Sequence, residues 1–141
     1  MREILFKAKR KDDGKWVDGC YQKRYDLLGN EEHLIFHADS YKVWEYAEID
    51  SETLCQFTGL TDKNGQKIWE NDIVNHNGEY VPIKFGVYCS NFDYGSYNLG
   101  FYADFSEGPF YRKEFGYWCR KVEVVGNIFD NKELLQEGSD E

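Results

Sequence analysis

The sequence predicts an all-β protein, built mainly from antiparallel hairpins around a small barrel-like, SH3-like core, with one short helix near the C-terminus. The 141 residues include 25 aromatic residues, eight Val and seven Ile, but only four Ala. Aromatic and β-branched side chains fit a pleated sheet, whereas Ala favours helices. Asn-Gly pairs at 64–65 and 77–78 are flanked by apolar runs of strand length, which is the strongest short-range signal of a hairpin.

The N-terminal part of the chain predicts four strands. Residues 4–10 alternate between apolar and charged side chains, and the Asp-Asp-Gly sequence at 12–14 offers a turn into a returning strand at 15–22. Two further apolar segments, 33–37 and 41–49, also have strand character. They are split by a short polar break, so we expect a second pair of strands here.

The centre of the chain predicts a run of strands joined by tight turns. Strand segments are expected at 55–60, 67–69, 72–76 and 79–88. The Asn-Gly pairs between them suit type I′ turns, because that turn needs positive φ at both central residues. Pro82 lacks a backbone N–H, which places the last of these strands at a sheet edge or interrupts it with a bulge.

The C-terminal part begins with an aromatic tract, in which residues 85–118 include 13 aromatic side chains among Gly, Asn and Ser. A late strand follows at 120–129. Asp130 or Asn131 can cap a short helix at 132–137. We expect one domain over residues 1–136 and an acidic tail at 137–141.

The net charge of −9 is unevenly distributed along the chain. Residues 1–24 hold eight cations and four acids, a net charge of +4, so residues 25–141 carry −13. Residues 26–52 form an acidic belt, with eight acids against a single cation, Lys42. Because phosphate binding needs clustered Lys and Arg, this balance argues against a general nucleic-acid-coating protein.

The four cysteines, at positions 20, 55, 89 and 119, form no C-x-x-C pair. Structural zinc sites use closely spaced ligand pairs, so we expect no zinc and no other cofactor. The N-terminus has no apolar run of signal-peptide length, and no segment is as long as a membrane span. We therefore predict a cytoplasmic protein with reduced cysteines and no membrane contact.

Asp62, Asn64 and Gly65 superficially resemble part of a calcium loop. If Gly65 were the sixth position of an EF-hand loop, Leu60 and Asn71 would be the first and twelfth positions, where carboxylates are required. The stretch therefore fails as a calcium site. We interpret Asn64 and Gly65 as a structural turn.

Other residues that carry chemistry give weak signals. His33 and His37 have the spacing of two metal ligands on a helix, but on a strand that spacing corresponds to roughly 13 Å. His76 is a lone candidate in a turn. Glu70 and Asp72 share a strand face, yet neither a G-x-S-x-G nor a G-x-x-x-x-G-K motif is present. We predict no metal ligands, no catalytic residues and no enzymatic activity.

Two groups of residues are candidate interaction surfaces. The candidate interface lies in the aromatic tract and comprises Tyr94, Tyr97, Phe101 and Tyr102. Acids outnumber cations in this tract, so we favour core packing and a protein interface over nucleic-acid binding. The candidate acidic surface comprises Asp39, Glu45, Glu48, Asp50 and Glu52.

Three segments together resemble the YopX family of phage and prophage proteins: MREILFKAKRKDDGKWVDG at the start, QFTGLTDKNGQKIWENDIV in the centre and VEVVGNIFDNKELL near the end. The resemblance leaves residues 21–53 and 79–120 uncovered. It implies a β-rich fold and a phage or prophage origin in bacteria of the Gram-positive type, and it implies no reaction. Asn71 replaces the usual Gly of the family, and Asn tolerates positive φ nearly as well.

Four functional hypotheses follow, in order of preference. The first is a phage accessory protein without enzymatic activity that binds protein in the bacterial cytoplasm, either a second copy of itself or a host protein. The second is an acidic mimic of nucleic acid that inhibits a host DNA-handling or defence protein. The third is a nucleic-acid-binding module that uses the basic N-terminal hairpin and the aromatic tract. The fourth is an enzyme without a recognised motif.

Overall fold

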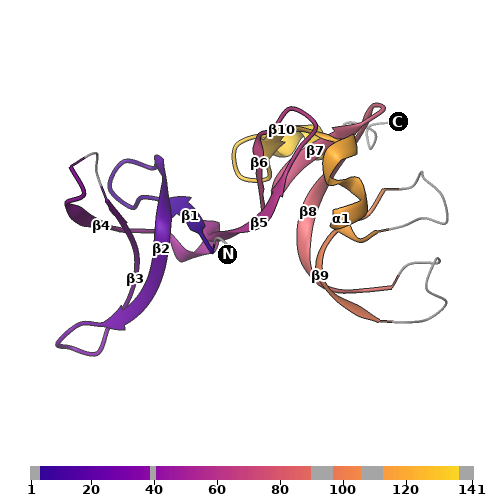
Figure 1. Cartoon of the computed structure of the whole chain (residues 1–141). Helices are drawn as coiled ribbons and strands as arrows, with labels where there is room; N and C mark the ends of the chain where they lie inside the picture. Colours follow the sequence, from indigo (N-terminus) through magenta and orange to yellow (C-terminus); the bar gives the residue numbers. More distant parts are fainter. Residues whose placement is uncertain (1–3, 39–40, 90–96, 106–112, 137–141) are drawn as a thin grey trace. The chain divides into compact units, whose positions relative to one another are not determined.

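The computed structural model describes residues 4–38, 41–89, 97–105 and 113–136. The chain divides into two compact units, Met1–Phe57 and Thr58–Glu141, and antiparallel strands dominate both (Figure 1). The predicted all-β fold of antiparallel strands is therefore confirmed. The assignment of residues 1–136 to one domain stays a prediction.

The first unit is an antiparallel sheet in which neighbouring strands follow the order β4-β3-β2-β1-β5. Its strands are β1 (Phe6–Lys9), β2 (Trp16–Tyr25), β3 (Glu31–Ala38), β4 (Trp44–Glu48) and β5 (Cys55–Thr61). A 3₁₀ turn, η1 (Ser51–Thr53), joins β4 to β5. The Asp50 carboxylate caps η1 by accepting a hydrogen bond from the Glu52 N–H.

No barrel closes in the described part of the chain, which corrects the expected barrel-like, SH3-like core. The chain after β4 returns to the end of β1 through an isolated bridge between Arg10 and Ile49. Two backbone hydrogen bonds flank this bridge, from Lys11 N–H to Glu48 and from Asp50 N–H to Lys9. A closed barrel needs a continuous ladder around its circumference, and this contact is too short to provide one.

The core of the first unit is small. Ala8, Ile35 and Ile49 are fully buried, and the partly buried side chains packed against them are Phe6, Val17, Tyr21 and Leu54. Val17 and Tyr21 alternate along β2 with Trp16, Asp18 and Cys20, which therefore point to the opposite face of the sheet. Trp16, Asp18 and Cys20 of that opposite face line a pocket.

The second unit contains a four-stranded antiparallel sheet in the order β10-β7-β8-β9, and β5 continues into this unit to pair with β6. The strands of this unit are β6 (Lys67–Trp69), β7 (Asp72–His76), β8 (Glu79–Tyr88), β9 (Asn98–Ala103) and β10 (Glu123–Asn127). The helical segments are α1 (Phe115–Trp118), its 3₁₀ continuation η4 (Cys119–Lys121) and the 3₁₀ helix η5 (Lys132–Gln136).

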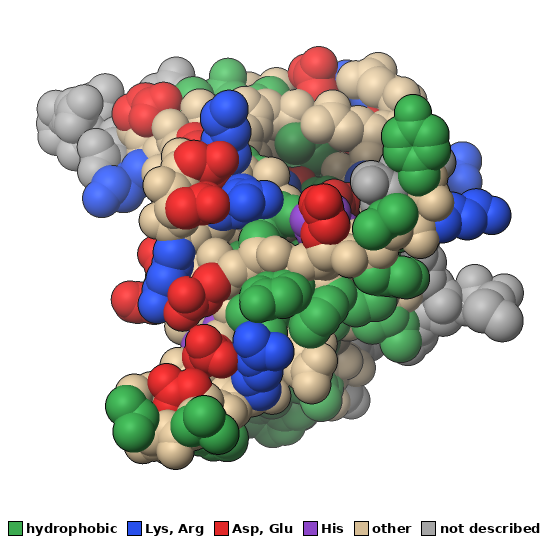
Figure 2. Space-filling model, turned by 90° about the vertical axis from the view of Figure 1, so that its left-hand side faces the viewer, with side chains coloured by type: hydrophobic (Ala, Val, Ile, Leu, Met, Phe, Trp, Pro, Cys, Tyr) green, Lys and Arg blue, Asp and Glu red, His purple; other side chains and the backbone are tan. Residues whose placement is uncertain are grey.

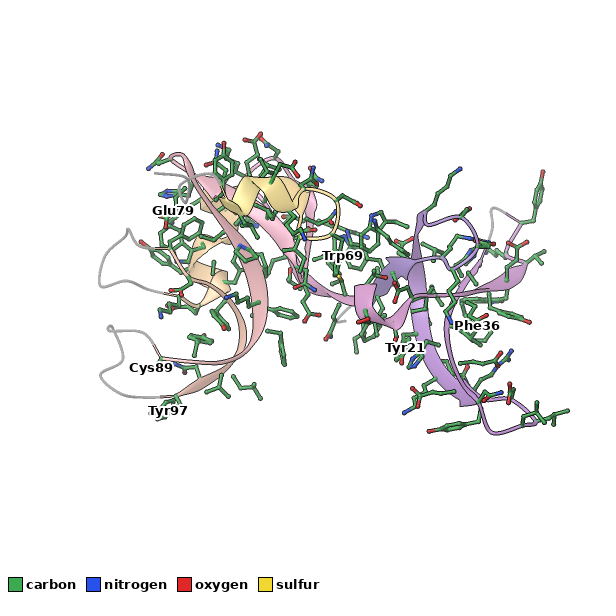
Figure 3. The ribbon with its side chains drawn as sticks, turned by 180° about the vertical axis from the view of Figure 1, so that it is seen from behind. Tyr21, Phe36, Trp69, Glu79, Cys89 and Tyr97 are labelled. Atoms are coloured by element: carbon green, nitrogen blue, oxygen red, sulfur yellow. The ribbon has the colours of Figure 1, made fainter. Side chains whose placement is uncertain are left out.

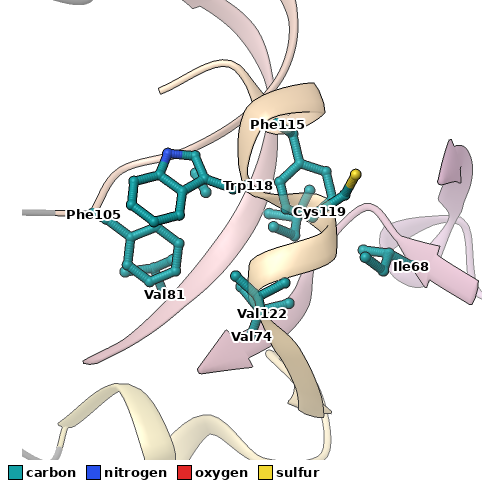
Figure 4. Close-up of a cluster of buried hydrophobic side chains, with 10 residues drawn as sticks. Ile68, Val74, Val81, Phe105, Phe115, Trp118, Cys119 and Val122 are labelled. Carbon is teal, nitrogen blue, oxygen red and sulfur yellow. The ribbon is translucent and has the colours of Figure 1, made fainter. Parts of the chain in front are cut away.

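The larger hydrophobic core lies in the second unit, between α1–η4 and the sheet (Figure 4). Phe115 and Trp118 of α1 are fully buried. The centroids of the Trp118 and Phe105 rings lie 4.6 Å apart. The sheet contributes buried aliphatic side chains, namely Val74, Val81, Ile83 and Ala103. This cluster accounts for the short α1, because aromatic burial stabilises a helix that four residues could not maintain alone.

Two predicted details differ in the structure. The expected C-terminal helix at 132–137 is the 3₁₀ helix η5, and the α-helix α1 lies inside the aromatic tract instead. β8 lies between β7 and β9, but Pro82 pairs with Ile73 of β7 beyond the last residue of β8 that pairs with β9, Ile83. Pro82 therefore lies outside the part of β8 that pairs with β9, and its lack of a backbone N–H costs no hydrogen bond to β9. Among the described residues, no helix is long and apolar enough to cross a membrane.

Candidate functional site

The β8–β9 hairpin carries a row of apolar side chains that begins in the core and continues into solvent. Directly opposed residues in antiparallel strands share one face, as do residues two positions apart. The opposed pairs on this face are Ile83–Ala103, Phe85–Phe101 and Val87–Leu99. The first pair is fully buried, whereas the residues of the other two pairs are only partly covered.

We call the outer part of this row the apolar stripe, comprising Phe85, Val87, Leu99 and Phe101. Phe85 is 50% exposed, Val87 is 64% exposed and Leu99 is 71% exposed. The Phe85 and Phe101 rings meet edge to face, with centroids 4.9 Å apart. Adjacent, exposed apolar side chains make the stripe a candidate interaction surface.

The four residues of the predicted aromatic interface do not lie together on one face of the β8–β9 hairpin. Phe101 belongs to the apolar stripe, and Tyr97 immediately precedes β9 and is 80% exposed. Tyr97 and Cys89 lie at the same end of the β8–β9 hairpin (Figure 3). Tyr102 points to the other face of the hairpin, where the centroids of the Tyr102 and Tyr88 rings lie 5.1 Å apart. Tyr94 lies outside the described residues.

The sequence-based prediction missed three members of the apolar stripe: Phe85, Val87 and Leu99. Their signal was present, because apolar residues recur at every second position along 83–87 and again along 99–103. This period of two indicates one apolar strand face. The aliphatic residues Val87 and Leu99 are the more exposed part of the stripe.

A second candidate site is a pocket of about 410 Å³ in the first unit. It lies on the face of the sheet opposite the core of that unit. The side chains that matter to its chemistry are Leu5, Trp16, Asp18, Cys20, Phe36 and Trp44. Its lining also includes Gly19, where an added Cβ would collide with the carbonyl oxygen of Phe36. Glycine is thus required for the close approach of β2 and β3 at this point.

His33, a metal-ligand candidate, has protein partners on both ring nitrogens. The Tyr21 hydroxyl lies 2.6 Å from His33 Nδ1, and His33 Nε2 lies 2.8 Å from a Glu31 carboxylate oxygen. Hydrogen bonds from His33 and then Lys23 lower the pKa of Glu31. Because both nitrogens are engaged, we interpret this chain of contacts as a structural brace between β2 and β3.

Metal binding gains no positive support from the other candidates. The His76 ring packs edge-on against Trp118, with centroids 5.0 Å apart. Asp72 is buried and accepts a hydrogen bond from the Trp69 N–H, which is a structural role near the β6–β7 turn. Within the described ranges, no three His, Cys, Asp or Glu side chains gather into a group that could hold an ion.

The candidate acidic surface is divided by the geometry of β4. Glu45 lies opposite His37 and Glu48 lies opposite Leu34, so the two acids point to opposite faces of the strand. Glu48 also forms an ion pair with Lys11 at 3.4 Å. Asp50 caps η1, Glu52 is exposed, and Asp39 lies outside the described residues. On the face shown in Figure 2, acidic and basic side chains are interspersed.

The central turn is organised by the buried side chain of Asp62. Its carboxylate accepts hydrogen bonds from the N–H groups of Asn64 at 2.8 Å, Gln66 at 2.9 Å and Val124 at 3.0 Å. Burial raises the pKa of Asp62, but the hydrogen bonds from Val124, Gln66 and Asn64 outweigh burial and hold the pKa below its usual value. All three named donors are backbone groups, so Asp62 has a structural role.

The turn itself corrects the expected type I′ geometry. Gly65 has φ +83°, and the Gly65 N–H donates to the Asp62 carbonyl, but Asn64 is not among the described residues with positive φ. This pattern fits a type I turn followed by a left-handed glycine, which is the usual three-residue hairpin loop. At the second Asn-Gly pair, Asn77 has φ 53° and Gly78 has φ 90°, as a type I′ turn requires.

Comparison with protein families identifies the chain. A family model described as YopX protein matches residues 5–136. The chain belongs to the YopX family. No curated protein matches the sequence at a significant level. The YopX match therefore covers both units and also the two segments that the sequence motifs had left uncovered.

The structure gives a physical reason for the YopX motif residues. Asn71, at the position where the family usually has Gly, has φ 72°, so the side chain is tolerated in a left-handed conformation. Gly126 leaves space for Asn131, whose side chain accepts a hydrogen bond from the Asn127 N–H at 3.1 Å. Asn71 and Gly126 therefore shape the local backbone, whereas Leu5, Trp16, Asp18 and Gly19 of the N-terminal motif line the pocket.

Proposed function

We propose that this YopX-family chain is a phage or prophage accessory protein that acts without enzymatic chemistry, as a self-associating β module in the cytoplasm of a bacterial host. The apolar stripe on β8 and β9 carries this proposal. Its exposed side chains continue the core row of the hairpin beyond the cover of α1, so burial against another protein surface would be favourable.

The chemistry of the stripe favours a second copy of the chain as the partner. Its four side chains are uncharged and apolar, so they offer no complementarity to a strongly charged partner. A matching apolar surface is always available on a second copy, and two-fold association lets the same patch serve both partners. The net charge of −9 opposes association at low ionic strength, and salt screens that repulsion.

The acidic mimic has less support than self-association. A phosphate mimic needs several carboxylates exposed on one side, whereas Glu45 and Glu48 point to opposite faces of β4. Lys11 also partly neutralises Glu48. A non-enzymatic role agrees with the hydrogen-bonded state of His33 and with the structural roles of Asp62 and Asp72.

Sedimentation velocity over a wide range of protein concentrations and salt concentrations tests the proposal. We expect the wild-type chain to self-associate and to remain associated at high salt. Val87→Lys should abolish association, because it places a charge in the centre of the apolar stripe. The matched control is Val43→Lys, since Val43 is 55% exposed and lies in the first unit. A wild-type chain that is monomeric at every concentration would exclude self-association.

A further inference from the structure

We propose that the pocket on the first unit binds a nucleobase that carries an adjacent phosphate, either in a single-stranded nucleic acid or in a free nucleotide. This inference concerns a surface other than the apolar stripe and does not depend on the proposed function. It rests on the pocket, on the aromatic rings at its rim and on the cations beside them.

The pocket provides aromatic surface for a flat ligand. Trp16, Phe36 and Trp44 line its 410 Å³, which is within the range of small-ligand pockets. Trp44 is 63% exposed, so a large part of its surface is open to a ligand. Tyr46 lies on the same face of the sheet, and the centroids of the Tyr46 and Phe36 rings are 5.6 Å apart. Trp44 and Tyr46 are exposed and Trp16 and Phe36 are partly exposed, and aromatic rings on one sheet face can stack with bases.

Cations lie beside these rings, where a phosphate attached to a stacked base would need them. The Lys7 ammonium lies 4.7 Å from the centre of the Trp16 ring, and the Lys9 ammonium lies 5.5 Å from it. At the other end of the row, the Arg24 guanidinium lies 5.1 Å from the Tyr46 ring. Cations that rest on aromatic rings can move from the ring to an anionic ligand at modest cost.

The acids of this face are largely balanced by neighbouring cations. Asp18 lies directly opposite Lys7 in the β1–β2 register. Glu32 forms an ion pair with Arg24 at 2.9 Å, and Glu48 pairs with Lys11. Lys9 lies directly opposite Trp16 in the same register, so its positive charge is beside the ring. The overall negative charge of the chain predicts modest affinity that falls as salt rises.

The chemistry of the pocket disfavours other small ligands. A quaternary ammonium group would suit aromatic rings, but Lys7 and Lys9 already place positive charge beside Trp16. A purely apolar ligand would leave Asp18 and these lysines without a role. A flat ring with a linked negative charge is the class that uses both the aromatic side chains and the cations.

Fluorescence anisotropy with a labelled, mixed-sequence single-stranded DNA oligonucleotide tests the inference on the full chain. We expect binding that weakens with salt, and Trp44→Ala should weaken it about tenfold, because stacking contributes about 1–3 kcal/mol per base. Lys7→Gln combined with Lys9→Gln should weaken binding and also reduce its salt dependence. Competition with an unlabelled mononucleotide distinguishes the two sources of the base: equal competition per base indicates a free nucleotide, and weak competition indicates a strand.

Tyr25→Ala is the matched control. Tyr25 is an exposed aromatic residue of the same sheet with Lys23 stacked on it, but it lies far along β2 from the pocket. Its loss should leave binding unchanged. Circular dichroism of each variant verifies the fold, and Trp44 is exposed enough for its removal to be tolerated. No binding by the wild-type chain, or binding that inorganic polyphosphate matches and that Trp44→Ala leaves intact, would overturn the inference.

Discussion

The carboxylate of Asp62 accepts a hydrogen bond of 3.0 Å from the backbone N–H of Val124, which lies 62 residues further along the chain. This contact ties the central turn to the start of β10. The adjacent hydrogen bond from Lys63 N–H to the Val122 carbonyl strengthens the connection. The central and C-terminal motifs of the YopX family thus meet at one buried carboxylate, and we expect the stability of the second unit to depend on it.

Asp62→Asn should destabilise the protein by about 1–3 kcal/mol at neutral pH, because a partly buried backbone N–H group loses its acceptor. The amide of Asn retains one oxygen but turns an NH₂ group toward one of the former donors. Urea unfolding of the wild-type and variant chains measures the difference. Asp26→Asn is a control at an exposed turn carboxylate, for which we expect a smaller loss.

Stability should also fall in acid through protonation of Asp62. Its pKa in the folded protein lies below the usual value, so its contribution is complete above the unfolded pKa of about 3.9 and is lost as pH falls through the lower folded pKa. Unfolding free energies between pH 7 and strongly acidic pH measure this loss. The difference between wild type and Asp62→Asn should shrink over the acidic range, and a constant difference would contradict the assignment.

Gly65→Val should cost about 1–3 kcal/mol, because a β-branched residue is strained at φ +83°. No atom outside the turn lies within 4 Å of the added Cβ, so the backbone conformation alone would cause the loss. Thermal unfolding gives the comparison with Gly86→Val, which also introduces Val into open space but at a strand position without positive φ. Equal melting temperatures for the two variants would argue against a left-handed Gly65.

Gly126→Ala should destabilise the C-terminal motif by about 1–3 kcal/mol through overpacking. The new Cβ would collide with the side chain of Asn131, which holds the Asn127 N–H. Displacing Asn131 would therefore break a hydrogen bond as well as relieve the collision. Gly86→Ala, which meets no atom within 4 Å, is the volume-matched control in denaturant unfolding.

Truncation of Tyr97 or Phe101 to Ala should weaken self-association by about 2 kcal/mol or more, as expected for aromatic residues at the centre of an interface. The dissociation constant from sedimentation equilibrium measures each effect. Tyr41→Ala is the control, because Tyr41 is 85% exposed but belongs to the first unit. Unchanged association in both Tyr97 and Phe101 variants would remove the aromatic residues from the interface.

Much of the strand pattern could be predicted because its causes are local. The segments 67–69, 72–76 and 79–88 coincide with β6, β7 and β8, since alternating apolar residues and Asn-Gly turns act over a few neighbouring residues. The aromatic tract could not be divided in this way. Its residues 98–103 form a strand and residues 115–118 a helix, because long-range packing of Phe105, Phe115 and Trp118 decides between them.

The candidate surfaces show the same limit. The residue type of Tyr97 and Phe101 predicts an interface, but the stripe also requires Val87 and Leu99, which meet only through the β8–β9 register. The pocket was not foreseen, because Trp16, Phe36 and Trp44 come from three different strands. The separation of Glu45 from Glu48, in contrast, follows from their spacing in the sequence, because side chains three positions apart on a strand point to opposite faces.

Composition, turn residues and motifs are properties of short segments, so the amino-acid sequence is enough to predict the β-rich class, the positions of the hairpin turns and membership of the YopX family. Three-dimensional packing is needed to show that Asp62 joins the central turn to β10, which apolar side chains remain uncovered and which aromatic rings share a pocket. These relationships depend on strand register and on contacts between residues far apart in the chain. Local preferences do not encode them, because the same segment can bury or expose a face according to what packs against it.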